Sequence, residues 1–162
     1  MKKAFLLICF IIFSFSSCEK DDFCTENPVT PHLVLRFYDN ANRNTLKTVQ
    51  NLSIYAANKD TLIDYTSVNL DSVAIPLNAI ANETVYFLKM NNTNGATATN
   101  ETAKFTIQYT PEPLYVSRSC GYKITYNTVS FSTDPNTWIL DFTPSTLTAI
   151  DNQNNAHVQI FH

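Results

Sequence analysis

The chain has 162 residues, a formal net charge of −3, 15% charged residues and 12% aromatic residues. A chain of this length forms a domain of ordinary size, and its aromatic content argues against a disordered protein. Its acidic balance and its lack of a basic stripe argue against nucleic-acid binding.

The amino terminus is predicted to be a secretory signal peptide. Two lysines supply a short positive start, and residues 4–15 form a run of 12 residues without charge. A helix needs about 20 apolar residues to cross a bilayer core, so this run is too short to span one. Ser16 and Ser17 are the small residues that a signal peptidase requires, and we assign residues 1–17 to the signal. The alternative, a buried core helix, would show polar residues at helical spacing, which this run lacks.

Cys18 follows this signal directly. The stretch FSSC (residues 15–18) resembles the lipobox of bacterial lipoproteins, although leucine is more common than phenylalanine at its first position. The resemblance implies that the Cys18 thiol receives a diacylglyceryl group and becomes the first residue of the mature protein. Each buried CH₂ group contributes about 0.8 kcal/mol, so two or more acyl chains hold a protein stably at a membrane. A disulfide is the alternative fate of this thiol.

The residues after Cys18 carry a second resemblance. The stretch EKDD (residues 19–22) is similar to the charged residues that follow the lipidated cysteine in Bacteroidota-type lipoproteins of the outer leaflet. It implies an outer-membrane protein, with the cell surface favoured over the periplasmic face. The alternative is that these charges only keep a tether solvated. Residues 18–31 are polar and contain Pro28 and Pro31, so we expect a tether between anchor and domain.

Cys24 and Cys120 are predicted to form a disulfide. Cys9 leaves with the signal peptide and Cys18 takes lipid, and two remaining thiols in an oxidising compartment pair most simply with each other. Such a bridge closes a loop of roughly a hundred residues, to which the chain-entropy model assigns about 4.7 kcal/mol. It would also fasten the tether to the far half of the fold. The competing interpretation, a metal or nucleophile pair, needs a third partner that we do not find in the sequence.

Alternation of apolar and polar residues, typical of strands, dominates the rest of the chain. The segments predicted as strands are, in chain order, HLVLRFYD, NLSIYAA, TLIDY, DSVAIPL, TVYFLKM, AKFTIQYT, LYVSRSCGYKITYN, TVSFS, TWILDF, LTAI and HVQIF. The clearest alternation, in AKFTIQYT, places Phe105, Ile107 and Tyr109 on the inward face. Clusters of turn-forming residues separate most of these segments.

Prolines and the absence of helical spacing define the expected fold class. Pro76 indicates an edge strand or a strand end, and we expect Pro111 and Pro113 to interrupt their strand. No window sustains apolar spacing of three and four, so we expect no long helix. With about eight to ten short strands, residues 32–162 are predicted to form a single all-β domain, an antiparallel β-sandwich of immunoglobulin-like or transthyretin-like arrangement. A small barrel is the alternative.

Few residues suggest catalysis or a cofactor, and we predict neither. Phosphate-cradling loops and nucleophile elbows need glycine, and the two glycines, Gly95 and Gly121, lie outside such motifs. The histidines are His32, His157 and His162. The last two are five residues apart, so a continuous strand would point them to opposite faces. We therefore expect solvent-exposed histidines rather than a zinc site.

Two polar segments invite a calcium interpretation. Residues 39–44 and 151–155 are rich in Asp and Asn, whose oxygens suit calcium. A calcium loop of the EF-hand type also needs a glycine at its sharp turn and a final glutamate. Because neither segment shows this pattern, we predict turns capped by their own side chains, and no metal.

Trp138 and the tyrosines raise the question of a sugar-stacking platform. Trp138 alternates with Leu140 and Phe142, and this pattern favours a stripe of core residues. Sugar stacking by Trp138 stays as the alternative.

Two short motifs suggest glycosylation. The triplets DTL (60–62) and DSV (71–73) resemble the O-glycosylation acceptor pattern of exported Bacteroidota proteins. The resemblance makes Thr61 and Ser72 candidate acceptors, which would then face solvent. Three-residue matches also arise by chance.

The stretches CEKDDFC, LVLRFYDN, NLSIYA and SRSCGYKITYN together resemble an uncharacterised family of small Bacteroidota-type outer-membrane lipoproteins, classed as a domain of unknown function. This resemblance supplies no activity and adds support for the Cys24–Cys120 pairing. We expect a lipid-anchored, non-catalytic binding or interaction module, whose partners are the membrane and either another outer-membrane protein or a glycan. The alternative is a carbohydrate-binding accessory lipoprotein, and an enzyme comes third.

Overall fold

The computed structural model describes residues 23, 24, 26, 29–92 and 100–162. The predicted signal peptide, residues 1–17, and the predicted acylation site Cys18 lie outside the described residues. The chain divides into two compact units. The larger unit comprises Val29–Leu114 and Lys123–His162, and the described part of the smaller unit comprises residues 23, 24 and 26 with Tyr115–Tyr122.

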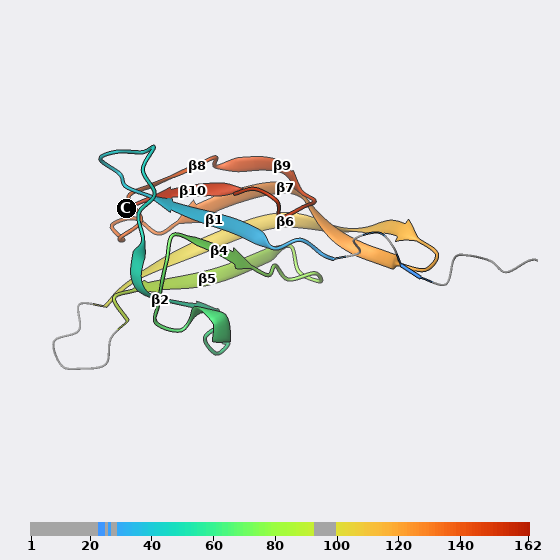
Figure 1. Cartoon of the computed structure of the whole chain (residues 1–162), viewed down its shortest axis with the longest axis horizontal. Coiled ribbons are helices and arrows are strands. Elements are labelled where there is room, and N and C mark those ends of the chain that lie inside the picture. Colours follow the sequence, from blue (N-terminus) through green and yellow to red (C-terminus); the bar gives the residue numbers. More distant parts are fainter. Residues whose placement is uncertain (1–22, 25, 27–28, 93–99) are drawn as a thin grey trace, which may run out of the picture. The chain divides into compact units, whose positions relative to one another are not determined.

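Two sheets pack together in the larger unit as an all-β sandwich (Figure 1). The four-stranded sheet has the order β4-β1-β10-β8, formed by β1 (Leu33–Tyr38), β4 (Ser72–Ile75), β8 (Asp141–Thr143) and β10 (Val158–Phe161). The six-stranded sheet has the order β3-β2-β5-β6-β7-β9, formed by β2 (Val49–Ala56), β3 (Val68–Leu70), β5 (Glu83–Met90), β6 (Glu101–Ser117), β7 (Gly121–Thr133) and β9 (Thr146–Ile150). Both β6 and β7 extend into the smaller unit.

The predicted fold class is confirmed. The described residues contain these ten strands and one 3₁₀ turn, Ile63–Tyr65, which agrees with the expected number of strands and with the absence of a long helix. None of the helical residues described here forms a helix long and apolar enough to span a bilayer. The immunoglobulin-like or transthyretin-like arrangement stays a prediction.

Strand alternation builds the core as the sequence predicts. On β6, Phe105 and Ile107 are fully buried and Tyr109 is nearly so, whereas Gln108 is exposed. Alternate residues of a strand point to opposite faces of the sheet, so one face of β6 supplies a row of side chains to the space between the sheets. The largest fully buried side chains come from both sheets and are Tyr126, Phe37, Phe105, Leu33, Leu35, Leu52, Ile54, Ile75, Leu88, Ile107, Ile150 and Ile160.

One strand pair departs from the antiparallel expectation. β1 and β10 pair in parallel, with Leu35 opposite Val158 and Tyr38 opposite Phe161. Parallel neighbours need a long connection instead of a hairpin. Here that connection is almost the whole sandwich, because β1 opens it and β10 closes it. The local pattern of either strand carries no information about this pairing.

The effect predicted for two prolines is wrong. Pro111 and Pro113 do not interrupt their strand, because β6 continues through both to Ser117. The pairing of β5 with β6 ends at Gln108, so β6 lacks that neighbour where the prolines occur. A proline is tolerated where its missing N–H would face no partner strand. The expectation for Pro76 is confirmed, because this residue directly follows β4, an edge strand.

Candidate functional site

A disulfide organises the smaller unit. Cys24 and Cys120 are bonded, with Cα atoms 4.8 Å apart, and this is the predicted pairing. Cys120 lies in the turn between β6 and β7, and Cys24 follows the predicted acylation site Cys18 by six positions. The bond therefore fastens the β6–β7 turn to a segment that is close, along the chain, to the predicted lipid anchor.

The β6–β7 turn is formed by short polar side chains and a glycine. The Cys120 N–H donates to Ser117 Oγ at 3.1 Å, and Ser119 Oγ donates to the Phe23 carbonyl oxygen at 3.4 Å. Gly121 has a φ of +74°, in the left-handed region that side chains with a Cβ avoid. A Cβ at this position would meet no atom within 4 Å, so the backbone conformation rather than a close contact requires glycine here.

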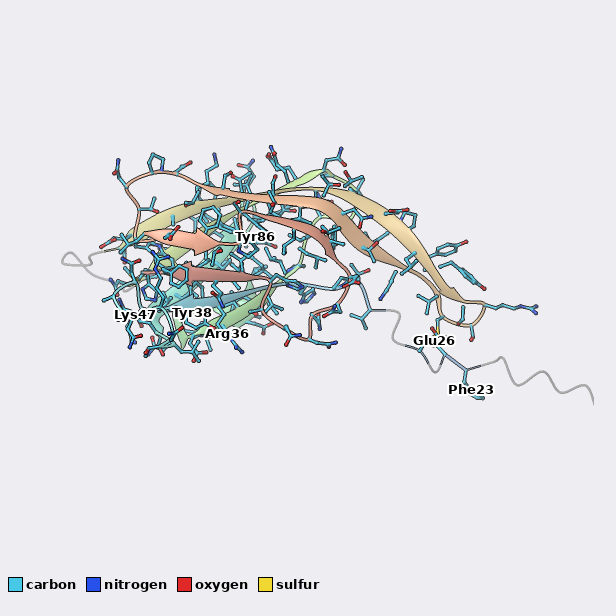
Figure 2. The ribbon with its side chains drawn as sticks, turned by 90° about the horizontal axis from the view of Figure 1, so that it is seen from above. Phe23, Glu26, Arg36, Tyr38, Lys47 and Tyr86 are labelled. Carbon is cyan, nitrogen blue, oxygen red and sulfur yellow. A yellow bond between two sulfur atoms is a disulfide. The ribbon has the colours of Figure 1, made fainter. Side chains whose placement is uncertain are left out.

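Three aromatic side chains of the smaller unit are open to solvent. Phe23, Tyr115 and Tyr122 are 81%, 55% and 67% exposed. We call these three residues the tip aromatics. The rings of Tyr115 and Tyr122 form a T-shaped pair with centroids 5.2 Å apart, and Figure 2 shows Phe23 near Glu26 on the segment that carries Cys24. Large apolar side chains that gather in the open commonly mark an interaction surface.

Two shallow clefts formed by described residues of the larger unit are candidate sites for chemistry. One, of about 430 Å³, is lined by residues that include Lys59, Glu83 and Tyr86, and the other, of about 580 Å³, by residues that include Glu83, Gln108 and Tyr109. Enzymes that hydrolyse a substrate by acid–base catalysis usually pair one carboxylate with a second carboxylate or with a histidine. Among the described residues that line these clefts, Glu83 has no such neighbour.

The tyrosines beside these clefts hold the backbone. The hydroxyls of Tyr86, Tyr126 and Tyr109 donate to the three successive carbonyl oxygens of residues 76–78, at 2.6, 3.0 and 2.9 Å respectively. We call this arrangement the tyrosine clasp. Thr84 adds a further hydrogen bond between its hydroxyl and that of Tyr109. In Figure 2 Tyr86 lies within the body of the larger unit, and the clasp holds the segment that follows β4.

Burial keeps the clasp protonated. Burial, with a smaller contribution from the neighbouring Tyr109, raises the pKa of Tyr86 and of Tyr126 to about 12. Burial also raises the pKa of Tyr109, against the opposing effect of its hydrogen bonds with Thr84 and Asn78. Their hydroxyls therefore stay neutral donors at neutral pH.

The polar segment 39–44 is a turn, as predicted, and an ion pair secures it. Arg43 donates to Asp141 Oδ2 at 2.7 Å and stacks over the Phe161 ring at 4.3 Å from its centroid. The hydrogen bond from Arg43 and a second one from the Phe142 N–H lower the pKa of Asp141. No group of three or more metal-ligating side chains occurs among the residues with described positions.

The expectation of exposed histidines is wrong for His162, which is buried, and only partly correct for His32 and His157, which are both half-buried. His162 is 9% exposed, and its ring meets the ring of Trp138 edge-on at 5.5 Å. His157 is partly buried, and its Nδ1 accepts from the Val34 N–H at 2.9 Å, while its Nε2 lies 2.9 Å from the Asn152 carbonyl oxygen. Burial lowers the pKa of both rings, because a charged imidazolium is costly away from water.

The sugar-stacking alternative for Trp138 is wrong. This side chain is 5% exposed, and its indole N–H donates to the Leu88 carbonyl oxygen at 3.0 Å. Trp138 belongs to the core, as the preferred interpretation held, but Leu140 is 63% exposed. The proposed alternation fails there because residues 138–140 precede β8 and have no strand geometry, so Trp138 and its neighbour Ile139 are both buried.

The two candidate glycosylation residues differ in their surroundings. Thr61 is exposed, and its backbone forms an isolated bridge with Tyr55. Ser72 lies on β4, is partly buried and donates its hydroxyl to the Leu35 carbonyl oxygen at 3.2 Å. A sugar on Ser72 would have to replace that hydrogen bond, whereas one on Thr61 would not. Modification of either residue stays a prediction.

The sequence pattern contains a signal for two of the tip aromatics, Tyr115 and Tyr122. Tyr115 continues the two-residue pattern of Ile107 and Tyr109 along β6, and Tyr122 lies four positions before the buried Tyr126 on β7. Both residues therefore stand at positions where the strand pattern calls for core residues. On β6 these positions are buried as far as Tyr109, whereas Pro111 is partly buried and Pro113 and Tyr115 are exposed. On β7, Tyr122 is exposed and Tyr126 is buried.

Comparisons with known proteins give one match. A family model described as a family of unknown function (DUF6452) matches residues 51–162. Neither the curated proteins nor the solved structures gave a match. The matched range contains Cys120 and the tyrosine clasp, and it begins after Cys24 and the predicted acylation site.

Proposed function

The chain belongs to the DUF6452 family of unknown function, and from that premise we propose that it is a lipid-anchored, non-catalytic protein of the cell envelope. Diacylglyceryl-Cys18 would hold it at the outer membrane, with the cell surface favoured over the periplasmic face. The sandwich would serve as a binding or interaction module.

The Cys24–Cys120 disulfide is the observation that carries this proposal. Disulfides persist in oxidising compartments outside the cytosol, where a lipobox also directs a protein. The bond lies six positions after Cys18, a span of at most about 20 Å in extended chain. An acyl group on Cys18 would therefore keep the disulfide, and the β6–β7 turn attached to it, near the membrane.

The roles of the titratable groups support a non-catalytic function. In the described part of the chain, the groups with shifted pKa values have structural partners. The clasp tyrosines donate to carbonyl oxygens, and Asp141 pairs with Arg43. His157 accepts from the Val34 N–H, and the His162 ring packs edge-on against Trp138. A catalytic site instead gathers perturbed groups in a cleft, where they can reach a substrate. Binding through a surface requires no such cluster.

Mass spectrometry of the protein purified from cell membranes tests the anchor. We expect a mature chain that begins at Cys18 and carries a diacylglyceryl group. Cys18→Ser should abolish the modification and release the protein from the membrane fraction. Cys9→Ser is the matched control, because Cys9 lies within the predicted signal and should leave lipidation unchanged. An unmodified Cys18 thiol on a soluble product would contradict the proposal.

Protease treatment of intact cells then shows which face of the outer membrane carries the protein, since a protein that faces the periplasm would survive.

A further inference from the structure

We propose that Tyr115 and Tyr122 lie in the headgroup region of the same bilayer that holds the Cys18 anchor, as a second contact between the protein and the membrane. This inference rests on the proposed function, because acylated Cys18 brings the bilayer close. It identifies a lipid surface as the binding partner of Tyr115 and Tyr122, two of the tip aromatics.

Covalent connections limit how far these rings can lie from the anchor. Six positions separate Cys18 from Cys24, a reach of at most about 20 Å. The disulfide adds a Cα–Cα distance of 4.8 Å to Cys120, and Tyr122 follows Cys120 by two positions. Without the disulfide, 102 positions of chain would separate Cys18 from Cys120. The bond therefore keeps Cys120, and the turn that contains it, within about 25 Å of Cys18.

The chemistry of the two side chains fits the boundary between lipid and water. Tyrosine has an apolar ring and a polar hydroxyl, and it is enriched where membrane proteins cross the headgroup layer. Tyr115 and Tyr122 are 55% and 67% exposed and meet edge-to-face, so together they present one apolar surface with two hydroxyls. Both continue the strand faces that bury Tyr109 and Tyr126 in the larger unit, and they present ring surface where those faces are no longer buried. Exposed apolar side chains that lie together mark an interaction surface.

Charged and polar residues beside the two tyrosines limit how deeply this turn can enter the bilayer. Arg118 lies in the turn between the two tyrosines, together with Ser117 and Ser119, and Glu26 lies near Cys24. Ionised side chains are costly in the hydrocarbon core but are accommodated at the headgroups, where arginine also acts as an anchor. The tip therefore rests at the headgroup level and does not enter the acyl chains. Two tyrosine rings are too few to hold a protein alone, so this contact orients a chain that lipid already anchors.

A fluorescence experiment on the lipidated, full mature protein tests the contact. Tyr122→Trp places a probe at the tip, and Ile80→Trp places a matched probe at a residue of the larger unit that is 94% exposed. The native Trp138 is 5% exposed and gives the same background in both variants. Each protein is reconstituted in phosphatidylcholine vesicles with plain acyl chains or with acyl chains brominated close to the headgroup, where the bromines quench indoles in the adjoining headgroup region.

We expect brominated lipid to lower the emission of the Tyr122→Trp protein and to leave that of the Ile80→Trp protein unchanged. Tyr115→Trp should be quenched like Tyr122→Trp and provides an independent second probe of the tip. If the tip variants are quenched no more than Ile80→Trp, whether because the tip is in water or because it contacts another protein copy, the inference is overturned. Equal quenching of all three also overturns it, because the contact would then not be specific to the tip.

Acylation is measured by mass spectrometry on the same samples. An unmodified Cys18 overturns the proposed function together with this inference. An acylated protein without quenching at the tip overturns this inference alone.

Discussion

Tyrosines on the same strand have different roles, depending on whether the side chain is buried or exposed. Tyr126 is fully buried, yet its hydroxyl finds an acceptor in the Leu77 carbonyl oxygen at 3.0 Å. Tyr122, four positions earlier on the same strand, is mostly exposed. The same residue type therefore stabilises the fold at one position and presents a surface at the other, and solvent exposure decides which.

Tyr126→Phe should reduce the free energy of unfolding by about 1–3 kcal/mol, because it leaves a buried carbonyl group without its hydroxyl donor. Chemical denaturation monitored by circular dichroism measures the change. Tyr122→Phe is the matched control and should change stability by less than about 0.5 kcal/mol, as surface substitutions usually do. If Tyr126→Phe and Tyr122→Phe changed the free energy of unfolding equally, the Tyr126 hydroxyl would contribute no more to stability than the exposed Tyr122 hydroxyl.

At the scale of elements, the β6–β7 hairpin is the part that differs most from expectation. β6 has 17 residues and β7 has 13, and each supplies residues to both compact units. Pro111 and Pro113 are local signals for a strand end, but a strand that has already lost a neighbour can accommodate them. The disulfide at the turn then joins this hairpin to a segment 96 positions away in sequence.

Replacing both cysteines, in Cys24→Ser/Cys120→Ser, should lower the free energy of unfolding by about 2–5 kcal/mol, because the unfolded chain regains the freedom that the disulfide removes. Denaturant unfolding of the oxidised protein and the double variant gives the difference. A reducing agent should destabilise the native protein by a similar amount and leave the double variant unchanged. A thiol assay on the unreduced, folded protein should find neither cysteine free, and two reactive thiols would refute the pairing.

At the scale of the whole molecule, stability depends on side chains that come from distant parts of the chain. Phe37 of β1 lies 6.1 Å from Trp138 and 6.2 Å from His162, measured between ring centroids. The clasp likewise joins β5, β6 and β7 to the segment after β4. Disruption of either cluster acts on both sheets, so loss of structure should be cooperative.

Alkaline pH should unfold the protein through the clasp. The pKa of Tyr86 and Tyr126 is about 12 in the folded protein, against 10.0 for an ordinary tyrosine. The unfolded chain therefore loses these protons first, so the clasp contributes fully below pH 10 and its contribution falls as the pH rises from 10 to about 12. Stability measured by denaturation across this range should decline, and the decline should be shallower in Tyr86→Phe/Tyr126→Phe. An equally steep decline in that variant would assign the effect to other groups.

Several features of this protein follow from sequence alone, because their causes are local. Strand alternation predicts the buried face of β6, at Phe105, Ile107 and Tyr109, and the sandwich class follows from many such segments without helical spacing. The disulfide follows from counting thiols. A strand pattern, however, does not show whether a second sheet covers it, and for this reason the exposure of Tyr115 and Tyr122 was missed.

Other features depend on which parts of the chain meet. The parallel pairing of β1 with β10, the burial of His162 and the hydrogen bond from the Trp138 indole to Leu88 all join residues that are distant in sequence. A side chain's local pattern sets its preference for apolar or polar surroundings, but only its tertiary neighbours supply the acceptor, the ring or the water that satisfies it. The fold class and the bonded cysteines therefore follow from local patterns and a count of thiols, whereas the packing of distant segments selects which aromatic residues form the core and which remain open to a partner.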